Sequence, residues 1–153
     1  MAEYDLLAQA VEDAGNEVFW FGGVNQAQIE RLKSILQTTL PHSFERFLEH
    51  YGGGGVVGAE ISGIENNNAE MESGGTVLGD TRECQNRYAL PNGLVVIYFH
   101  DDEVCWCLDT LKTTASECPV VSYDVFRRKV DRQISSDFSS FFKQHLALYG
   151  ERI

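Results

Sequence analysis

The chain has 153 residues, a formal net charge of −11, and 43% hydrophobic against 23% charged residues. This length predicts a single domain over residues 1–153, and the apolar content excludes an intrinsically disordered chain. No apolar stretch reaches the roughly 18 residues of a membrane span, so no membrane partner is expected. The acidic excess disfavours nucleic-acid binding, which depends on Lys and Arg contacting phosphates, and favours association with a basic partner.

The N-terminal segment predicts two helices with a short extended piece between them. Apolar residues at helical spacing predict a helix over about residues 2–14, and an aromatic run at 17–21 predicts the extended piece. The side chain of Asn25 should cap the second helix. Gln28, three residues later, should return the capping hydrogen bond.

A third helix is predicted to begin at Pro41, because the missing N–H of proline would have no partner at a first helical position. Its buried face should carry residues spaced at i, i+3, i+4 and i+7, which are Phe44, Phe47, Leu48 and Tyr51. The glycine run that follows should end this helix.

Beyond the glycines the pattern becomes that of strands, which are predicted at 57–61, 94–99, 104–108 and 119–123. The segment 94–99 is apolar on both faces, as a central strand should be. Residues 100–103 should form the turn of a hairpin. Residues 65–75 predict a polar loop, and 76–88 have weak helical character.

The closing helix is the clearest element of the pattern. Ser135 or Ser136 should cap it, with Asp137 in its first turn. Its buried face should carry Phe138, Phe141, Phe142, Leu146 and Tyr149. Helices, then strands, then a helix predict an α+β domain in which an antiparallel or mixed sheet is flanked by helices.

The glycines at 53, 55 and 58 match the spacing of a dinucleotide-binding loop. In such a loop a strand precedes the glycines and a helix follows, whereas here a helix precedes and a strand follows. We therefore interpret the run as a turn in which several residues need positive φ.

Four cysteines raise the question of a metal or a reactive thiol. Cys105 and Cys107 fall on a predicted strand, where both thiols face one side, which fits small core residues better than a zinc cage. No spacing pairs a histidine with a cysteine, and no catalytic signature is present. We therefore expect no metal, no cofactor and no enzymatic activity. Free thiols and the absence of a secretory signal predict a cytoplasmic protein.

Two acidic segments are the candidate binding residues. Asp101, Asp102 and Glu103 occupy the predicted hairpin turn, where side chains point to solvent. A polar loop carries a second set, Glu65, Glu70 and Glu72. Loops on a rigid scaffold are where binding residues concentrate, although these acids could equally serve only solubility.

A basic cluster partly offsets this acidity near the C-terminus: Arg127, Arg128, Lys129 and Arg132. Two interpretations stay open for it. The cluster is either a patch for a phosphate or partner, or a solvated helix start or loop.

Several segments together resemble the SUKH superfamily, a cell-wall-regulator-like domain that is also widespread in bacteria. They are LPHSFERFLEHYGGGGVVGAEISGI (40–64), LVVIYFHDDEVCWCLDT (94–110), Pro119-Val120-Val121-x-Tyr123 and Ile134-x-x-Asp137-Phe138-x-x-Phe141. The likeness runs from about residue 24 to 148 and fades between 65 and 89.

This resemblance implies a non-enzymatic protein-binding domain. Bacterial members are largely immunity proteins that bind and neutralise a cognate polymorphic or contact-dependent toxin, often a nuclease, whose cationic site an acidic protein can cover. Two alternatives remain: a regulatory or scaffold domain without a toxin partner, and a small-ligand-binding or thiol-dependent enzyme.

Overall fold

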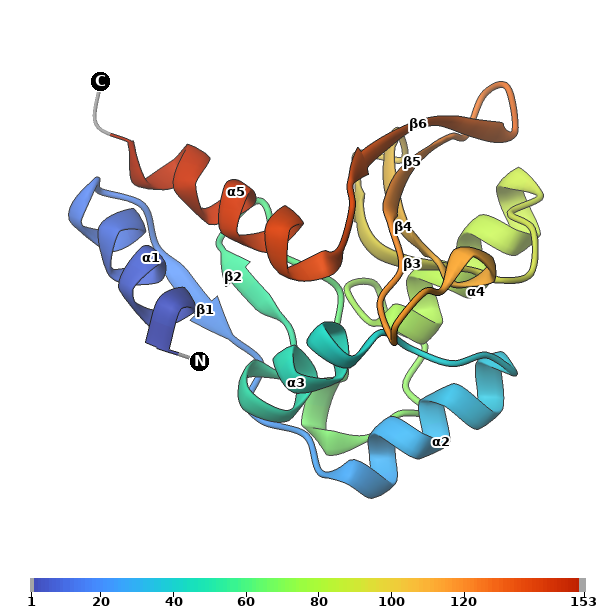
Figure 1. Ribbon diagram of the computed structural model, residues 1–153, viewed down its shortest axis with the longest axis horizontal. Coiled ribbons are helices and arrows are strands. Elements are labelled where there is room, and N and C mark those ends of the chain that lie inside the picture. Colours follow the sequence, from blue (N-terminus) through green and yellow to red (C-terminus); the bar gives the residue numbers. More distant parts are fainter. Residues whose placement is uncertain (1, 152–153) are drawn as a thin grey trace.

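The computed structural model describes residues 2–151, which form five α-helices and six strands and confirm the α+β prediction (Figure 1). The helices are α1 (Ala2–Asp13), α2 (Gln26–Leu36), α3 (His42–Tyr51), α4 (Val77–Tyr88) and α5 (Phe138–Gly150), with 3₁₀ turns at Glu65–Asn67 and Thr110–Lys112. The strands are β1 (Val18–Trp20), β2 (Gly54–Val56), β3 (Leu94–His100), β4 (Val104–Asp109), β5 (Val120–Asp124) and β6 (Lys129–Ser135).

The strands form two antiparallel sheets rather than one. β1 pairs with β2, and the larger sheet has the order β3-β4-β5-β6. The segment predicted as a central strand is therefore at an edge. β3 is nevertheless buried on both faces, and its backbone is covered, because Ile97 accepts a hydrogen bond from the Ser62 N–H (2.7 Å). The Val96 N–H donates to the Thr81 hydroxyl of α4 (3.0 Å).

Two hydrophobic clusters lie on opposite faces of the larger sheet. Val95 and Ile97 join the larger cluster, with α3 and α5, whereas Val96 joins the smaller one, with Cys84 of α4. Alternation along β3 sends its side chains to both faces, which explains its continuous apolar sequence.

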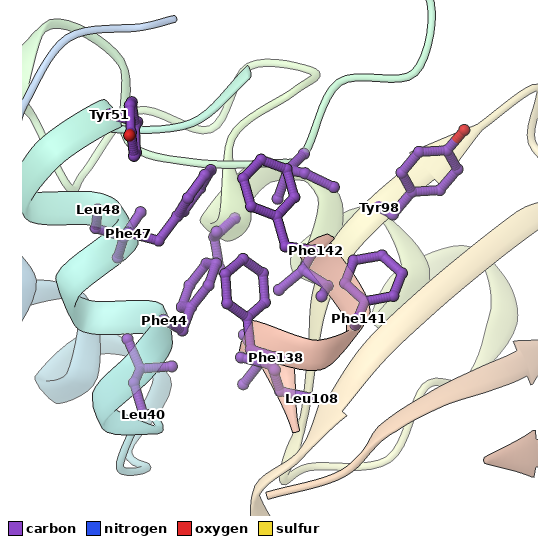
Figure 2. Packing of buried hydrophobic residues seen from close by; sticks show 14 of the residues in the cluster. Leu40, Phe44, Phe47, Leu48, Tyr51, Tyr98, Leu108, Phe138, Phe141 and Phe142 are labelled. Atoms are coloured by element: carbon purple, nitrogen blue, oxygen red, sulfur yellow. The ribbon is translucent and has the colours of Figure 1, made fainter. Parts of the chain in front are cut away.

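The larger cluster is rich in phenylalanine, and the residues predicted to share one core do so: Phe44, Phe47, Phe138 and Phe141. Figure 2 shows the rings of α3 and α5 facing one another. Phe44 meets Phe138, and Phe47 meets Phe142, each pair edge to face with centroids 4.9 Å apart. These contacts fix the two helices against each other.

Asn25 caps α2 as predicted, accepting from the Gln28 N–H at 3.0 Å, but the reciprocal bond from Gln28 does not form. The Gln28 side chain instead accepts from the Ala69 N–H (2.9 Å), and the Asn25 N–H donates to Asn67 (3.0 Å). The predicted capping partners thus tie α2 to the loop at 65–75.

Two other helix starts differ from the prediction. Asp137, not Ser135 or Ser136, caps α5 by accepting from the Ser140 N–H (2.8 Å). Ser135 is still the last residue of β6, so its backbone cannot begin the helix. Pro41 occupies the cap position of α3 rather than the first helical position, so the helix begins at His42, one residue later than predicted.

The strand predicted at 57–61 is wrong, because β2 lies within the glycine run and the chain turns at Val57 and Gly58. The glycines are needed there, since a Cβ on Gly54 would overlap the Phe19 carbonyl of β1. The turn interpretation itself holds, because every glycine from 52 to 55 has positive φ.

β6 was not predicted, because residues 129–133 are all exposed and show no alternation. The basic cluster therefore belongs to a hairpin turn and strand rather than to a helix start. Within residues 2–151, no helix is both long and apolar enough to cross a membrane.

Candidate functional site

A groove of about 350 Å³ opens between the loop at 65–75 and the end of β3. We call it the acidic groove, since three of its lining residues are carboxylic acids. It is lined by Phe19, Phe21, Glu60, Ser62, Glu65, Gly74, Gly75, Asp80, Phe99 and His100. A second hollow of about 290 Å³ shares Phe19, Phe21 and Glu65 and extends the groove to Asn66.

The aromatic wall of the acidic groove follows from strand alternation. Trp20 points into the core, where its ring lies 4.2 Å from that of Tyr51. Its neighbours Phe19 and Phe21 therefore project to the opposite face, with their ring centroids 6.3 Å apart. Phe19 is 59% exposed, which is unusual for a phenylalanine and leaves apolar surface at the groove mouth.

The loop wall is held by backbone and side-chain hydrogen bonds at both ends. Gly63 donates to the Gly75 carbonyl (3.1 Å) and accepts from the Val77 N–H (2.8 Å). Thr76 caps α4, accepting from the Gly79 N–H (2.9 Å), while its hydroxyl reaches back to the Ser73 carbonyl (2.7 Å). The loop is thus a fixed wall of the groove, although its sequence is polar.

The floor of the groove carries a buried carboxyl group. Asp80, in the first turn of α4, is 3% exposed and accepts from the Ser62 hydroxyl (2.6 Å) and the Gly75 N–H (3.2 Å). Burial raises the pKa of Asp80, and these two donors oppose that rise by stabilising the carboxylate. An approaching cation would favour the charged form further.

Glu60 and His100 form the wall opposite the loop. The His100 Nε2 lies 3.0 Å from the Glu60 carbonyl oxygen, so this nitrogen must carry a proton and donate. The Glu60 carboxylate accepts from the Gly58 N–H (3.0 Å) and is half-buried. This hydrogen bond fixes the position of the His100 ring, which directly precedes the hairpin turn.

The structure separates the predicted acids into three positions. Glu65 lines the acidic groove, half-buried. Asp101, Asp102 and Glu103 are exposed in the turn that directly follows His100 at the groove edge. Asp101 and Asp102 have φ of 60° and 52°, as in a type I′ turn, and Asp102 pairs with Arg87 of α4 (3.1 Å).

Glu70 and Glu72 lie outside the lining of the groove. Glu70 forms an ion pair with Arg31 of α2 (2.8 Å), at the end of the loop that α2 holds. Glu72 is exposed, and its backbone lies against Gly79 of α4. The two predicted segments therefore meet at the groove only through Glu65 and the turn.

Sequence reasoning missed Glu60, Asp80 and the aromatic wall. Phe19 and Phe21 carried a detectable signal, because their alternation with Trp20 predicts one outward face. Asp80 gave no signal, since its burial depends on Ser62 and Gly75, which come from other segments.

The four cysteines are free and buried, as the core-thiol interpretation predicts. The Cys105 sulfur lies 3.8 Å from that of Cys84 and 3.7 Å from that of Cys107. Hydrogen bonding within this cluster and burial raise the pKa values of Cys84 and Cys105, which keeps them as thiols. Within the described chain, no three His, Cys, Asp or Glu side chains are arranged to hold a metal ion.

The comparison with known families agrees with this architecture. A family model, SUKH_5, described as SMI1-KNR4 cell-wall, matches residues 5–147. The match begins in α1 and ends in α5, so it includes every residue of the acidic groove. The chain therefore belongs to the SMI1-KNR4/SUKH family.

Proposed function

We propose that this protein is an immunity protein, which binds a cognate toxin protein one to one and blocks the cationic site of that toxin. The SUKH family is known broadly for toxin-immunity and cell-wall-regulator-like domains. The observation that carries the proposal for this chain is the acidic groove, which places Glu60, Glu65 and Asp80 beside an exposed aromatic wall.

The groove suits a long basic side chain. The aliphatic part of a Lys or Arg can lie on the faces of Phe19 and Phe21, while its charge meets Glu60 and Glu65 at the rim. Asp80 lies deeper, and burial favours its protonated form. Since an arriving cation stabilises the carboxylate, binding should release a proton over the pH range in which Asp80 is protonated in the free protein.

The same geometry favours binding over catalysis. The hydroxyl of Ser62 donates to Asp80, which could orient a nucleophile, but burial, and after it the charge of Glu83, raises the pKa of Asp80. His100 directs its Nε2 proton to the Glu60 carbonyl, away from any role as a base for Ser62 through that nitrogen. The groove lining therefore holds no histidine base engaged with a hydroxyl or thiol.

A nuclease is the class of toxin that fits best, because its active site must be cationic where it meets phosphate. A net charge of −11 would speed the encounter with such a surface. The turn at Asp101, Asp102 and Glu103, directly beside the groove, would extend the acidic contact.

The experiment combines the purified protein with the product of the adjacent gene, which the proposal expects to be a toxin. The proposal expects a one-to-one complex, loss of toxin activity at one equivalent, and protection of cells that express both proteins. A scaffold domain would instead leave toxin activity unchanged, and that result would overturn the proposal.

Charge reversal then tests the two sequence-predicted segments separately. Asp101→Lys with Asp102→Lys should slow association at low salt, and the difference from the parent should shrink at high salt as the field is screened. Glu70→Lys with Glu72→Lys, outside the groove lining, should have the smaller effect. Unchanged association rates in both variants would exclude these acids from the recognition surface.

A further inference from the structure

The hairpin of β5 and β6 forms a second surface with the opposite charge. Its turn and strand carry Arg127, Arg128, Lys129 and Arg132 against one acid, Asp131, within a chain whose net charge is −11. We call residues 126–133 the basic hairpin. Two of its arginines make only long polar contacts. The Arg127 Nε lies 3.9 Å from an Asp124 carboxylate oxygen, and an Arg128 guanidinium nitrogen lies 3.4 Å from the Arg87 carbonyl oxygen.

The basic hairpin is uncovered on both faces. Every residue from 126 to 133 is exposed, and β6 reaches the core only near its end, through Ile134 and Ser135. Figure 1 shows the hairpin turn extending beyond the layer of α5. Phe126 is 74% and Val130 44% exposed, so apolar surface accompanies the cations.

β6 is also an open edge of the larger sheet. It is last in the strand order and pairs only with β5 among the strands of residues 2–151. Such an edge presents unpaired N–H and C=O groups, which can bind another extended chain. At the other end of the sheet, β3 is shielded by contacts from Ser62 and Thr81, and β6 has no equivalent cover among the described residues.

We propose that the basic hairpin is a docking site for an extended acidic segment of a partner polypeptide, which adds to β6 as a fifth strand. Backbone pairing supplies register, acidic side chains meet Lys129 and Arg132, and Phe126 and Val130 supply apolar anchors. This inference is independent of the acidic groove, since the two surfaces share no residue.

Charge selects this occupant over two others. A second copy of β6 would place like charges opposite one another, which destabilises an antiparallel pair. A nucleic acid would meet the same cations, but it has no peptide N–H and C=O groups to pair with the strand edge.

The test selects binders from a random twelve-residue peptide display library on the full-length protein. The same selection is run in parallel on the variant Lys129→Gln/Arg132→Gln, after its melting temperature has been shown to equal that of the parent protein. We expect peptides enriched on the parent alone to be acidic, with alternating β-branched residues. Their affinity should fall at least about tenfold in this variant and in Phe126→Ala.

Backbone pairing is tested with a selected peptide that is N-methylated at alternate residues. This change keeps the charge of the peptide and removes the backbone N–H donors along one of its edges. Methylation on the edge that faces β6 should abolish binding. The unmodified peptide should slow hydrogen exchange of the amides of residues 129–133.

Three outcomes would overturn the inference. They are selection of no peptide that depends on the hairpin, equal binding of the methylated peptide, and competition by an equal concentration of duplex DNA. A concentration-dependent dimer that Lys129→Gln/Arg132→Gln abolishes would assign the edge to self-association instead.

Discussion

The acidic groove and the basic hairpin differ in shape, in the sign of their charge and in the number of segments that form them. The groove is concave, and its lining comes from the β1 segment, the glycine-rich turn, the loop at 65–75, α4 and the end of β3. The hairpin is a single continuous segment that is exposed on both faces. A charge in the groove is therefore surrounded by several segments of the chain, whereas the hairpin charges are exposed and make only long contacts, to Asp124 and to the Arg87 carbonyl.

This difference predicts different energetic roles for the two regions. The groove lies beside the aromatic core, since Trp20, between the wall residues Phe19 and Phe21, contacts Phe47 and Phe142. Changes beneath the groove should therefore alter stability. Changes in the hairpin should alter only what binds there.

The largest effect is expected from Phe47→Ala. Phe47 is fully buried between α3 and α5, so truncation should lower the free energy of unfolding by about 3–5 kcal/mol. The matched control is Phe126→Ala in the exposed hairpin, which should change it by less than about 0.5 kcal/mol. Urea unfolding measures both, and similar losses in the two variants would contradict the assigned core.

Gly63→Ala should cost at least about 2 kcal/mol, because a Cβ there would overlap the backbone of Gly52 and Gly53 behind the groove. Gly74→Ala is the control on the loop wall, where a Cβ meets no atom within 4 Å. Its free energy of unfolding should stay within about 0.5 kcal/mol of the parent. A tolerated Gly63→Ala would mean that this wall can shift.

A smaller effect concerns pH. Because the folded pKa of Asp80 lies above its ordinary value of 3.8, the folded state binds the proton more tightly than the unfolded state. Asp80 therefore makes stability fall as pH rises from about 4 through its folded pKa. Asp80→Asn should remove this fall, so the stability of the variant relative to the parent should rise with pH.

Asp131→Asn, in the exposed hairpin, is the control for loss of a carboxyl group. Unfolding free energies measured at several pH values between about 4 and 7 test the difference. A constant offset between Asp80→Asn and the parent across this range would show that Asp80 does not titrate differently in the folded state.

The smallest effect is the reactivity of the thiols beneath the sheet. Burial raises the pKa of Cys118 to about 12, and Cys105 and Cys107 lie in the cluster that also contains Tyr123 of β5. A thiol-specific disulfide reagent should therefore react only slowly with the native protein. After denaturation it should react rapidly with all four thiols. Rapid reaction of one native thiol would show that the cluster containing it opens to solvent.

The sequence predicted the elements whose signal is local. Helical periodicity located α1, α2, α3 and α5, although only the cap of α2 was predicted correctly. A continuous apolar run followed by an acidic turn predicted the hairpin of β3 and β4. β6 was not predicted, because no other layer of the fold covers residues 129–133 and their sequence therefore shows no buried face. β2 escaped because its glycines, which usually weaken a strand, are required opposite Phe19 and Trp20.

The candidate site was predictable only where acids are exposed in turns. Glu65 and the turn at 101–103 were found from polarity alone, whereas Asp80 is buried by residues distant in sequence. Glu70 illustrates the converse, since its charge is locally conspicuous but is paired with Arg31 outside the groove. A composite site depends on long-range contacts that residue patterns do not encode.

The most direct test of the acidic groove is the affinity of Glu60→Gln/Glu65→Gln for the toxin that the proposal assigns to this protein. Both substitutions keep size and hydrogen-bonding oxygen while removing two charges. Glu12→Gln/Glu49→Gln removes the same charge from exposed positions outside the groove. Measured by calorimetry at physiological salt, the groove variant should bind at least about tenfold more weakly than the parent, and the control within about twofold. Equal affinities for the groove variant and the control would contradict the groove as the recognition surface.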